Sequence, residues 1–507
     1  MKKVDIIGGG IAGLALGIHL QKNGIATTIY EKHSVAGGLC TGWQRGDYTF
    51  NGCLHWILGT RDGISFYHFW KEIIDIDSVA VDYFDERVEI ELPLADRNGS
   101  HIFHFINDID KFEQYLLGIA PEDAAPIKQW ARQVRFIGKY LMFLPPVFTD
   151  APWYKSIWFK MKLMRLTPML FFMQKWARYS NVDFARKFKN PFLNMAIKKL
   201  YFNEMRMTVL FFAQAYATFG YAGYPHGGSL GFAQRIAEQY KALGGELRLK
   251  SEVRKVLTDN DKACGVELAT GERTRADFVA SAADWHWTIF DAIAPKYIPE
   301  TLKPLRSPAK EQIFYSFCML FLGINADLKS MPHFFRFPIE KITSPDGTEY
   351  DQLEVHIYNY DGELAPAGKT TASVNLQTRE GEYWISLRHN DIDEYRRKKE
   401  ELTELIISRL TQKLGADFTE RIEVKDLTTP ATYNRYTGNY NGSSQGWTPM
   451  DNIMQSISVK PTLPRLKNFI MAGHWQKAGG GVPVAVYTAR SAAWKICSIF
   501  GQKFKLK

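Results

Sequence analysis

Three glycines near the N-terminus, Gly8, Gly10 and Gly13, have the spacing of a turn that binds the phosphates of a dinucleotide. An apolar, strand-like run precedes them at 4–7, and a helix-like run follows at 14–23. Gly8 permits a tight turn, Gly10 lets the backbone approach a pyrophosphate, and Gly13 lets the helix pack against the strand. The helix N-terminus offers free N–H groups and a positive dipole. The pattern therefore predicts a dinucleotide site.

An acid follows at the end of the second apolar run. Glu31 lies 23 residues after Gly8, where a carboxylate accepts hydrogen bonds from ribose hydroxyls. A carboxylate there would repel a 2′-phosphate, which excludes NADP at this turn. We expect Ile11, Ala12 and Lys32, which lie beside these residues, to contact the nucleotide as well.

Glycines continue after the acid, at Gly37, Gly38, Gly42 and Gly46, and lead into the sequence YTFNG at 48–52. This pattern resembles the FAD-dependent family that includes phytoene desaturases, carotenoid isomerases and retinol saturases, with amine oxidases as more distant relatives. The resemblance implies FAD as cofactor, with Gly37, Gly38 and Leu39 passing the flavin. Leu39 stands where many members have Arg, and Asn51 where many have Asp. The segment 52–56, which contains His55, is similar to the saturase branch.

Two later segments extend the resemblance along the chain. The first runs from 223 through a helix at 230–243 and a strand at 246–250 to Val253, which the family places near the adenine. The second is a strand into a turn at 469–475, with Gly473, followed by Gly481 and Val482 at the start of a helix facing the flavin. All three segments keep the family's order. We therefore expect an α/β fold: a Rossmann-type FAD-binding domain, glutathione-reductase-like, with an inserted α+β substrate domain.

The same alignment of segments predicts the domain organisation. The FAD-binding domain is assembled from 1–70, 221–300 and 455–507. A helical insertion for membrane or substrate contact covers 71–220, with breaks at 145–146 and 152. A second insertion, 301–454, has strand-like runs at 313–324, 353–360, 372–377 and 383–388 and a charged helix at 393–414. No second G-x-G-x-x-G begins a strand–helix unit, so the sequence predicts no separate NAD(P)H-binding domain. Two electron partners stay open: NAD(P)H that reaches the flavin without such a domain, or a quinone.

The net charge of +9 over 507 residues is concentrated in one segment. The window 152–200 holds eleven Lys and Arg against Asp183, among Trp, Phe and Met residues. Interleaved cations and aromatic rings are typical of an anionic membrane surface; the alternative is a solvated basic face over an apolar core face. A nucleic-acid partner is not expected, because no binding motif accompanies the patch. The charge-free run 207–234 is broken by Pro225 and glycines and predicts a buried helix followed by a loop.

Five scattered cysteines without a C-x-x-C pair favour neither a zinc ribbon nor a disulfide scaffold, and we expect no metal site. A reducing cytosol is the natural compartment, and the N-terminus has no signal-peptide pattern. We therefore predict a cytoplasmic protein associated peripherally with a membrane. The sequence does not indicate an oligomeric state.

The resemblance implies hydride transfer at flavin N5 that saturates or desaturates a C–C bond of a lipophilic polyene or isoprenoid, carotenoid- or retinoid-like. His55 is the first candidate for proton transfer. Tyr436 could donate a proton or line the pocket. Three other functions stay open: a non-redox carotenoid cis–trans isomerase that uses reduced FAD, an amine oxidase, and a lipid-binding flavoprotein without catalysis.

Overall fold

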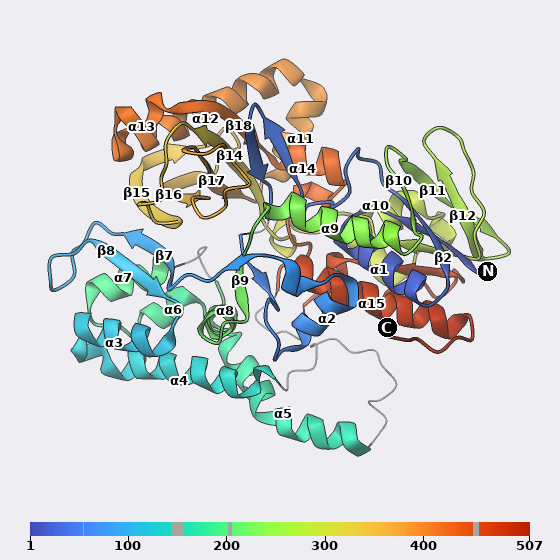
Figure 1. Ribbon diagram of the computed structural model, residues 1–507, viewed down its shortest axis with the longest axis horizontal. Helices are drawn as coiled ribbons and strands as arrows, with labels where there is room; N and C mark the ends of the chain where they lie inside the picture. Colours follow the sequence, from blue (N-terminus) through green and yellow to red (C-terminus); the bar gives the residue numbers. More distant parts are fainter. Residues whose placement is uncertain (54, 143–156, 201–204, 450–455, 507) are drawn as a thin grey trace.

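The computed structural model describes residues 1–506 except 54, 143–156, 201–204 and 450–455, and the side chains of 157–165 are also outside the description. The predicted breaks at Pro145, Pro146 and Pro152 fall outside the described residues. Two large sheets and a helical layer surround the centre of the molecule (Figure 1). All five cysteines are free thiols.

The first sheet is parallel and has the strand order β10-β2-β1-β13-β19. Its strands are nearly all buried, as is usual for a parallel sheet covered by helices. Helices α9 and α15 pack around α1, and residues 11–20 of α1 are therefore all buried. The bounds are β1 Lys3–Ile7, α1 Ile11–Lys22, β2 Ala26–Tyr30, α9 Gly228–Ala242, β10 Glu246–Arg248, β13 Phe278–Ser281, β19 Phe469–Met471 and α15 Gly481–Ile499.

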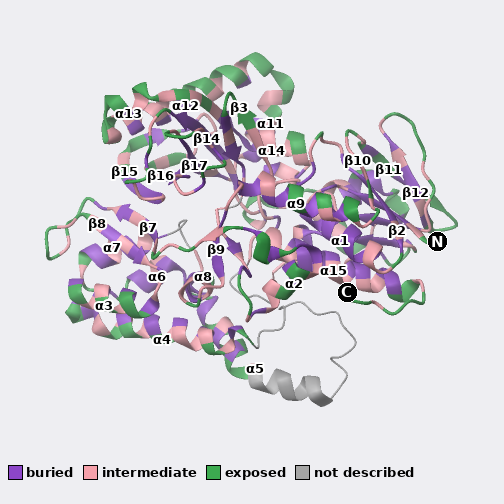
Figure 2. Cartoon of the chain, in the orientation of Figure 1, coloured by how far each residue is buried: buried purple, intermediate pink, exposed green. Residues whose placement is uncertain are grey.

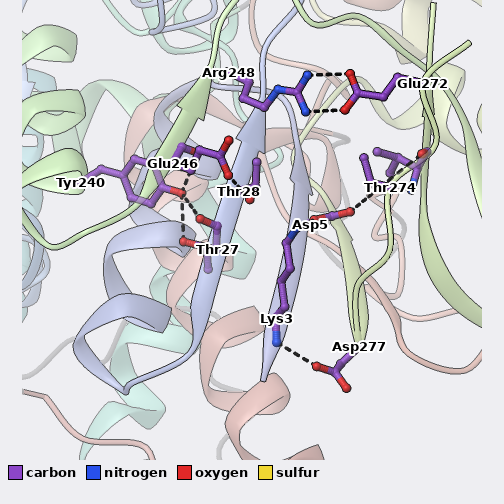
Figure 3. A network of polar contacts seen from close by, with 11 residues as sticks. Lys3, Asp5, Thr27, Thr28, Tyr240, Glu246, Arg248, Glu272, Thr274 and Asp277 are labelled. Carbon is purple, nitrogen blue, oxygen red and sulfur yellow. Dashed lines mark hydrogen bonds and ion pairs between the residues drawn. The ribbon is translucent and has the colours of Figure 1, made fainter. Parts of the chain in front are cut away.

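Polar contacts join the strands of this sheet, although they come from three distant stretches of the chain (Figure 3). The Arg248 guanidinium faces the Glu272 carboxylate in a two-pronged pair, with both N···O distances at 2.7 Å. The Tyr240 hydroxyl donates to the Thr27 carbonyl oxygen at 3.0 Å. The first contact joins β10 to the loop before β13, and the second joins α9 to β2. Across β2 and β10 themselves, the Thr28 hydroxyl donates to the Glu246 carboxylate at 2.9 Å. The chain segments that the sequence motifs mark thus converge on one sheet.

The second sheet has seven strands in the order β18-β14-β17-β16-β15-β7-β8, antiparallel except for the β15–β7 pair. Alternate residues of its central strands pack against helices α11 and α12, and the others face the interior of the molecule. Figure 2 shows the contrast between its buried strands and the exposed outer side of α12. The bounds are β7 Glu86–Glu91, β8 Ile102–Ile106, β14 Ser316–Ile324, β15 Phe334–Thr343, β16 Glu349–Ile357, β17 Thr370–Thr378, α11 Gly381–Asn390, α12 Ile392–Leu414, α13 Ala416–Glu420, β18 Ile422–Thr428 and α14 Pro430–Thr437.

Two expectations about the insertions were wrong in part. The run 383–388 is not a strand but lies within α11, where Glu382 in the first turn and Arg388 in the last turn suit the helix dipole. This helix buries only Gly381 and Trp384. The alternation of Tyr, Ile and Leu there imitates a strand. The range 71–220 is not purely helical, since it also supplies β7 and β8 to the second sheet.

The rest of that range forms a helical layer with an aromatic core around Trp130, Trp176 and Phe211. Helix α8 begins the charge-free run and has mostly buried residues, as expected, and β9 follows it. Among the described residues, no helix has both the length and the apolar character that crossing a bilayer requires. The bounds are α2 Ser65–Ile73, α3 Ile109–Ile119, α4 Ala124–Leu141, α5 Ile157–Trp176, α6 Asn181–Ala185, α7 Pro191–Lys199, α8 Met207–Thr218 and β9 Ala222–Pro225.

Smaller elements complete the described fold. A hairpin, β3 and β4, follows the glycines after Glu31, and a second hairpin, β11 and β12, follows β10. Strands β5 and β6 pair with either side of β9. The bounds are β3 Gly42–Arg45, β4 Tyr48–Asn51, β5 Ile57–Leu58, β6 Val81–Asp82, β11 Val253–Asp259, β12 Lys262–Leu268 and α10 Trp285–Trp287.

Candidate active site

One cavity of about 1630 Å³ lies between the two sheets and the helical layer. Pockets for a single small ligand usually measure about 300–1,000 Å³, so this cavity has room for a cofactor and a substrate together. Its walls include the turn after β1, the loops after β2 and β19, the inner face of the second sheet and part of α8. We describe it from the nucleotide end towards the second sheet.

The turn from β1 to α1 forms the nucleotide end. Gly8 has a φ of +94°, which a glycine adopts without strain, and its N–H donates to the Tyr30 carbonyl at 2.8 Å. A Cβ at Gly13 would lie 2.0 Å from the Gly8 carbonyl oxygen, so only glycine permits this contact between helix and turn. A Cβ at Gly10 would project towards the Gly37–Gly38 backbone with its nearest atom at 3.7 Å. The turn and the first residues of α1 therefore line the cavity, through Gly8, Gly10, Ile11 and Ala12.

Glu31 ends β2 and is nearly buried at the cavity wall. One carboxylate oxygen accepts from the Gly9 N–H at 2.6 Å, and the other accepts from the His33 N–H at 2.8 Å. These bonds fix the carboxylate beside the turn, where it can receive ribose hydroxyls. Glu31 thus lies beside the turn, and its contact with a ribose stays a prediction.

A second acid, Asp284, stands in the same wall after β13 and was not among the residues predicted from the sequence. Burial raises the pKa of Asp284 to about 6, while the N–H groups of Trp287 and Tyr440, which donate to it at 2.8 and 2.9 Å, act in the opposite direction. Burial also lowers the pKa of the neighbouring Lys32. The sequence position of Asp284 could have indicated this role. An acid that closely follows a parallel strand lies at the edge of the sheet where ligands bind.

The glycine-rich loops that follow form the middle of the cavity. Gly37 has a φ of +132°, and a Cβ there would lie 2.3 Å from the Cys40 carbonyl oxygen. A Cβ at Gly480 would lie closer still, 1.9 Å from the Gln445 carbonyl oxygen. Helix α15 begins at the next residue, Gly481, so its free N–H groups lie at the cavity. The ring of His474 lines the same region, and its buried Nε2 has no hydrogen-bond partner among the described residues.

His55 belongs to the side of the cavity next to the second sheet. Its ring stacks on His356 with the centroids 4.2 Å apart, and its Nδ1 lies 3.5 Å from the Tyr358 hydroxyl. Burial, assisted by His356, lowers the pKa of His55 to about 3. His55 is therefore a neutral imidazole near pH 7, able to donate or accept one hydrogen bond, and not a cationic acid.

The two residues predicted to act in catalysis have different locations. His55 lines the cavity. Tyr436 lies outside its lining with 43% of its surface exposed, and its ring contacts His33 at 5.0 Å. Tyr433, one turn earlier on α14, lines the cavity instead and donates to Thr428 or accepts from it at 3.0 Å.

The structure brings nearly all of the predicted cofactor-binding residues to this one cavity. Gly13 is the exception, because it supports the turn from within the helix and does not line the wall. The residues that line it are Gly8, Gly10, Ile11, Ala12, Glu31, Lys32, Gly37, Gly38, Leu39, Val253, Gly473, Gly481 and Val482.

Comparison with known proteins places the chain in a family. The model of the flavin containing amine oxidoreductase family matches residues 11–497. The chain belongs to this family, and its fold is the α/β fold of flavin-binding oxidoreductases. A crystal structure of an oxidoreductase from Methanosarcina mazei has the same fold, with a TM-score of 0.57 at 16% identity over 97% of this chain and 99% of that one. A putrescine oxidase variant gives a TM-score of 0.55 at 13% identity, over 98% and 99% of the two chains.

Curated relatives include isomerases and desaturases of carotenoids. A chloroplastic prolycopene isomerase of Daucus carota is 26% identical over 87% of this chain and 72% of its own length. A 4,4'-diapophytoene desaturase of a Methylomonas species is 24% identical over 99% and 97%. A lycopene-forming phytoene desaturase of a Paracoccus strain is 23% identical over 97% and 96%. The protein is thus a flavin oxidoreductase, distantly homologous to phytoene desaturases and prolycopene isomerases.

The residues present fit the flavin cofactor that the family implies. The glycine turn after β1 and Glu31 suit a dinucleotide, and the N-terminus of α15 suits the electron-rich end of a flavin. The unpartnered Nε2 of His474 supplies a hydrogen-bonding group in the same region. When bound, a flavin supplies the capacity to accept or donate a hydride.

Proposed function

We propose that the protein is an FAD-dependent oxidoreductase that saturates or desaturates C–C bonds of a lipophilic polyene or isoprenoid, carotenoid- or retinoid-like. One observation supports this proposal most directly. A single cavity extends from the nucleotide turn to the space between the second sheet and α8, which we call the chamber. Apolar side chains line much of that chamber, among them Phe317, Met319 and Leu210. Such a wall excludes water from a hydrocarbon chain and from the reacting carbon.

The protein's own residues would position the substrate and hold or transfer one proton. His55 is the polar group of the Cys53–Trp56 segment that faces the chamber, and its stacking on His356 fixes its ring plane. As a neutral imidazole it would orient a water or a substrate group by a hydrogen bond, because the cationic form is disfavoured by burial. The electron partner would be NAD(P)H or a quinone that reaches the flavin through the cavity itself.

The prolycopene isomerases among the relatives favour one second candidate, a cis–trans isomerase that uses reduced FAD without net redox change. The same cavity would serve both reactions. The two differ in the product: saturation adds and desaturation removes two hydrogen atoms, whereas isomerisation leaves the mass unchanged.

Product mass tests the proposed reaction. Purified holoenzyme is incubated without oxygen with a panel of carotenoids and retinoids, with a quinone as electron acceptor or NAD(P)H as electron donor, and the products are analysed by mass spectrometry. We expect at least one substrate to change in mass by two hydrogen atoms. Products that change only in geometry would replace the proposal by the isomerase, and peroxide release with amines and oxygen would replace it by an amine oxidase.

We also propose that the protein binds to an anionic membrane surface through the region 152–200. The part of this window up to Arg165 lies outside the described side chains. In the rest, Phe172, Trp176, Phe188 and Phe192 are buried in the helical core. Leu170 and Phe171 of α5 are 53% and 68% exposed, and Lys175 and Arg178 beside them are exposed too. Exposed apolar and basic side chains on one helix are typical of a helix that binds along a membrane surface.

The cavity reaches the surface next to these residues. Val209 of α8 both lines the cavity and is 46% exposed, and Met173 of α5 lines it as well. A lipophilic substrate could therefore enter from the membrane close to the exposed face of α5.

Charge reversal tests the membrane proposal. The double variant Lys175→Glu/Arg178→Glu should weaken binding to phosphatidylserine vesicles about 30-fold or more, since each basic residue near such a surface contributes about 1 kcal/mol. FAD content should not change. The control Arg254→Glu/Lys255→Glu alters exposed residues of β11 and should bind as the wild type does. Equal binding by both double variants would show instead that the basic residues form a solvated face.

A further inference from the structure

A buried histidine on the inner face of the second sheet hydrogen-bonds to a carboxylate. His356 lies near the end of β16, where it is 7% exposed and lines the cavity. Glu354 lies two residues earlier on the same strand and therefore on the same face of the sheet. The Nε2 of His356 is 3.2 Å from one oxygen of the Glu354 carboxylate. A carboxylate that accepts a hydrogen bond from an imidazole fixes the tautomer of the ring and stabilises its cation.

Glu354 is itself held by donors from both neighbouring strands. Arg336 of β15 forms an ion pair with one carboxylate oxygen, and the Asn375 amide of β17 donates to the other at 3.2 Å. Burial acts to raise the pKa of Glu354, but Arg336, His356 and Asn375 together hold it below its usual range. The carboxylate is therefore ionised near pH 7 and fixed beside the histidine.

Two stacked rings hold the plane of His356. Phe334, its directly opposed partner on β15, stacks on the imidazole with the centroids 4.0 Å apart and the planes inclined by 10°. His55 stacks on the same imidazole at 4.2 Å and 18°. Among the described residues, nothing hydrogen-bonds to the other nitrogen of His356, Nδ1. That nitrogen is therefore available to a ligand in the cavity.

The two stacked histidines differ in the groups that their nitrogens contact. The Nδ1 of His55 lies 3.5 Å from the Tyr358 hydroxyl, which is a neutral group. Burial, assisted by His356, lowers the pKa of His55 to about 3, so a cation there is disfavoured. A cation on His356 would instead have the Glu354 carboxylate at hydrogen-bond distance. Of the two imidazoles, His356 is the better placed to carry a proton.

We propose that His356, oriented by Glu354, takes up or delivers the proton that accompanies hydride transfer in this cavity. This inference rests on the proposed function and assigns its proton step, with Glu354 as a positioning residue. Desaturation breaks two adjacent C–H bonds and forms one C=C bond. One hydrogen leaves as a hydride to the flavin, which is reduced, and the other leaves as a proton to the Nδ1 of His356. Saturation moves the same hydride and proton in the opposite direction.

The other charges near His356 do not replace the role of Glu354. Burial lowers the pKa of His333 to about 3, as it does for His55, and it raises the pKa of Tyr358, so all three side chains are neutral near pH 7. The two arginines are positive and oppose a cation on His356. The titratable and charged side chains around this part of the cavity are His55, Arg87, His333, Arg336, Glu354 and Tyr358.

Nuclear magnetic resonance of the holoenzyme measures the protonation of His356 without turnover. With ¹⁵N-labelled histidine, the signals that disappear in His356→Gln identify its ring nitrogens. We expect the neutral ring to carry its proton on Nε2. In Glu354→Gln the midpoint of its titration should move about one pH unit or more to lower pH, because the amide cannot balance a cation. Glu349→Gln, which removes an exposed carboxylate from the same strand, should titrate as the wild type does.

Kinetics with a polyene that the holoenzyme converts test what the proton does. In His356→Gln the rate of flavin reduction or reoxidation by that polyene should fall about 100-fold or more, whereas its Kd and the FAD content stay at the wild-type level. In Glu354→Gln the pH profile of this rate should move together with the titration midpoint of His356. Glu354→Asp, which keeps the charge, should recover part of the rate.

The outcomes separate failure of this inference from misfolding and from failure of the proposed function. FAD content reports on the fold of each variant, and the tautomer of His356 is measured in the wild type. A neutral ring with its proton on Nδ1 would overturn the inference, and so would a wild-type rate in folded His356→Gln or an unmoved pH profile in folded Glu354→Gln. Absence of turnover with every polyene would contradict the proposed reaction, whereas turnover that does not depend on His356 would contradict only this inference.

Discussion

Replacing Gly13 with alanine should eliminate the FAD-bound form of the protein. The new Cβ would lie 2.0 Å from the Gly8 carbonyl oxygen and 3.1 Å from its carbon, and both are backbone atoms that cannot rotate away. The turn would have to move outwards from α1, which displaces the residues at the start of this helix that would hold the pyrophosphate. We expect FAD affinity to fall about 100-fold or more, equivalent to about 2.8 kcal/mol. Flavin absorbance per chain after gel filtration measures this loss.

Gly231→Ala is the matched control for this variant. Gly231 lies inside helix α9, and a Cβ there meets no atom within 4 Å. Alanine is a better helix former than glycine by about 1 kcal/mol, so this variant should keep its FAD and unfold at the wild-type temperature or above it. Wild-type FAD content in Gly13→Ala would show that the turn has another conformation.

Acid should destabilise the protein, because four histidines, one buried and three partly buried, are held as neutral rings. Burial lowers the pKa values of His19, His55 and His333 to about 3 and that of His474 to about 4. Below the ordinary pKa of 6.5 the unfolded chain takes up protons that the folded chain does not, so the free energy of unfolding falls as the pH falls. Each such histidine costs about 2 kcal/mol between pH 7 and pH 5.

His19 gives the clearest test of this acid effect, since it lies in α1 away from the cavity lining. Its ring contacts Phe504 at 5.8 Å and is 2% exposed. Urea unfolding at pH 7 and pH 5 should show His19→Gln losing about 2 kcal/mol less than the wild type over this interval. His68→Gln, which changes a largely exposed imidazole, should follow the wild type. A His19→Gln variant with the full wild-type loss would mean that His19 takes up its proton in the folded state.

The cofactor end of the site could be predicted from the sequence because it is a local structure. Gly8, Gly13 and Glu31 act through backbone geometry within one strand–helix–strand unit, and their spacing alone determines their contacts. Few turns other than a dinucleotide-binding one require glycines at this spacing between a strand and a helix. The later segments follow in the family's order along the chain, and Gly473 and Gly481 were predicted from that order.

The polar inner face of the second sheet, where Glu354, His356 and Asn375 line the cavity, could not be predicted in the same way. Glu354 and His356 alternate with Leu353 and Val355, and such alternation normally indicates one buried face and one face in water. In the structure α12 covers the apolar residues, and the polar ones face the cavity. Arg87 joins them through the parallel pairing of β7 with β15, which links positions that are far apart in the chain. Only tertiary structure reveals that this face of the sheet is enclosed.

The most direct test of the central claim is an anaerobic titration of the yellow holoenzyme with polyenes, followed in the visible flavin band. If one cavity holds FAD and a lipophilic polyene for redox chemistry, a substrate should bleach the oxidised flavin, or restore the colour of the reduced flavin, with one turnover per flavin. A flavin that stays bound and unchanged in both redox states with every carotenoid, retinoid and polyene acid tested would contradict this claim.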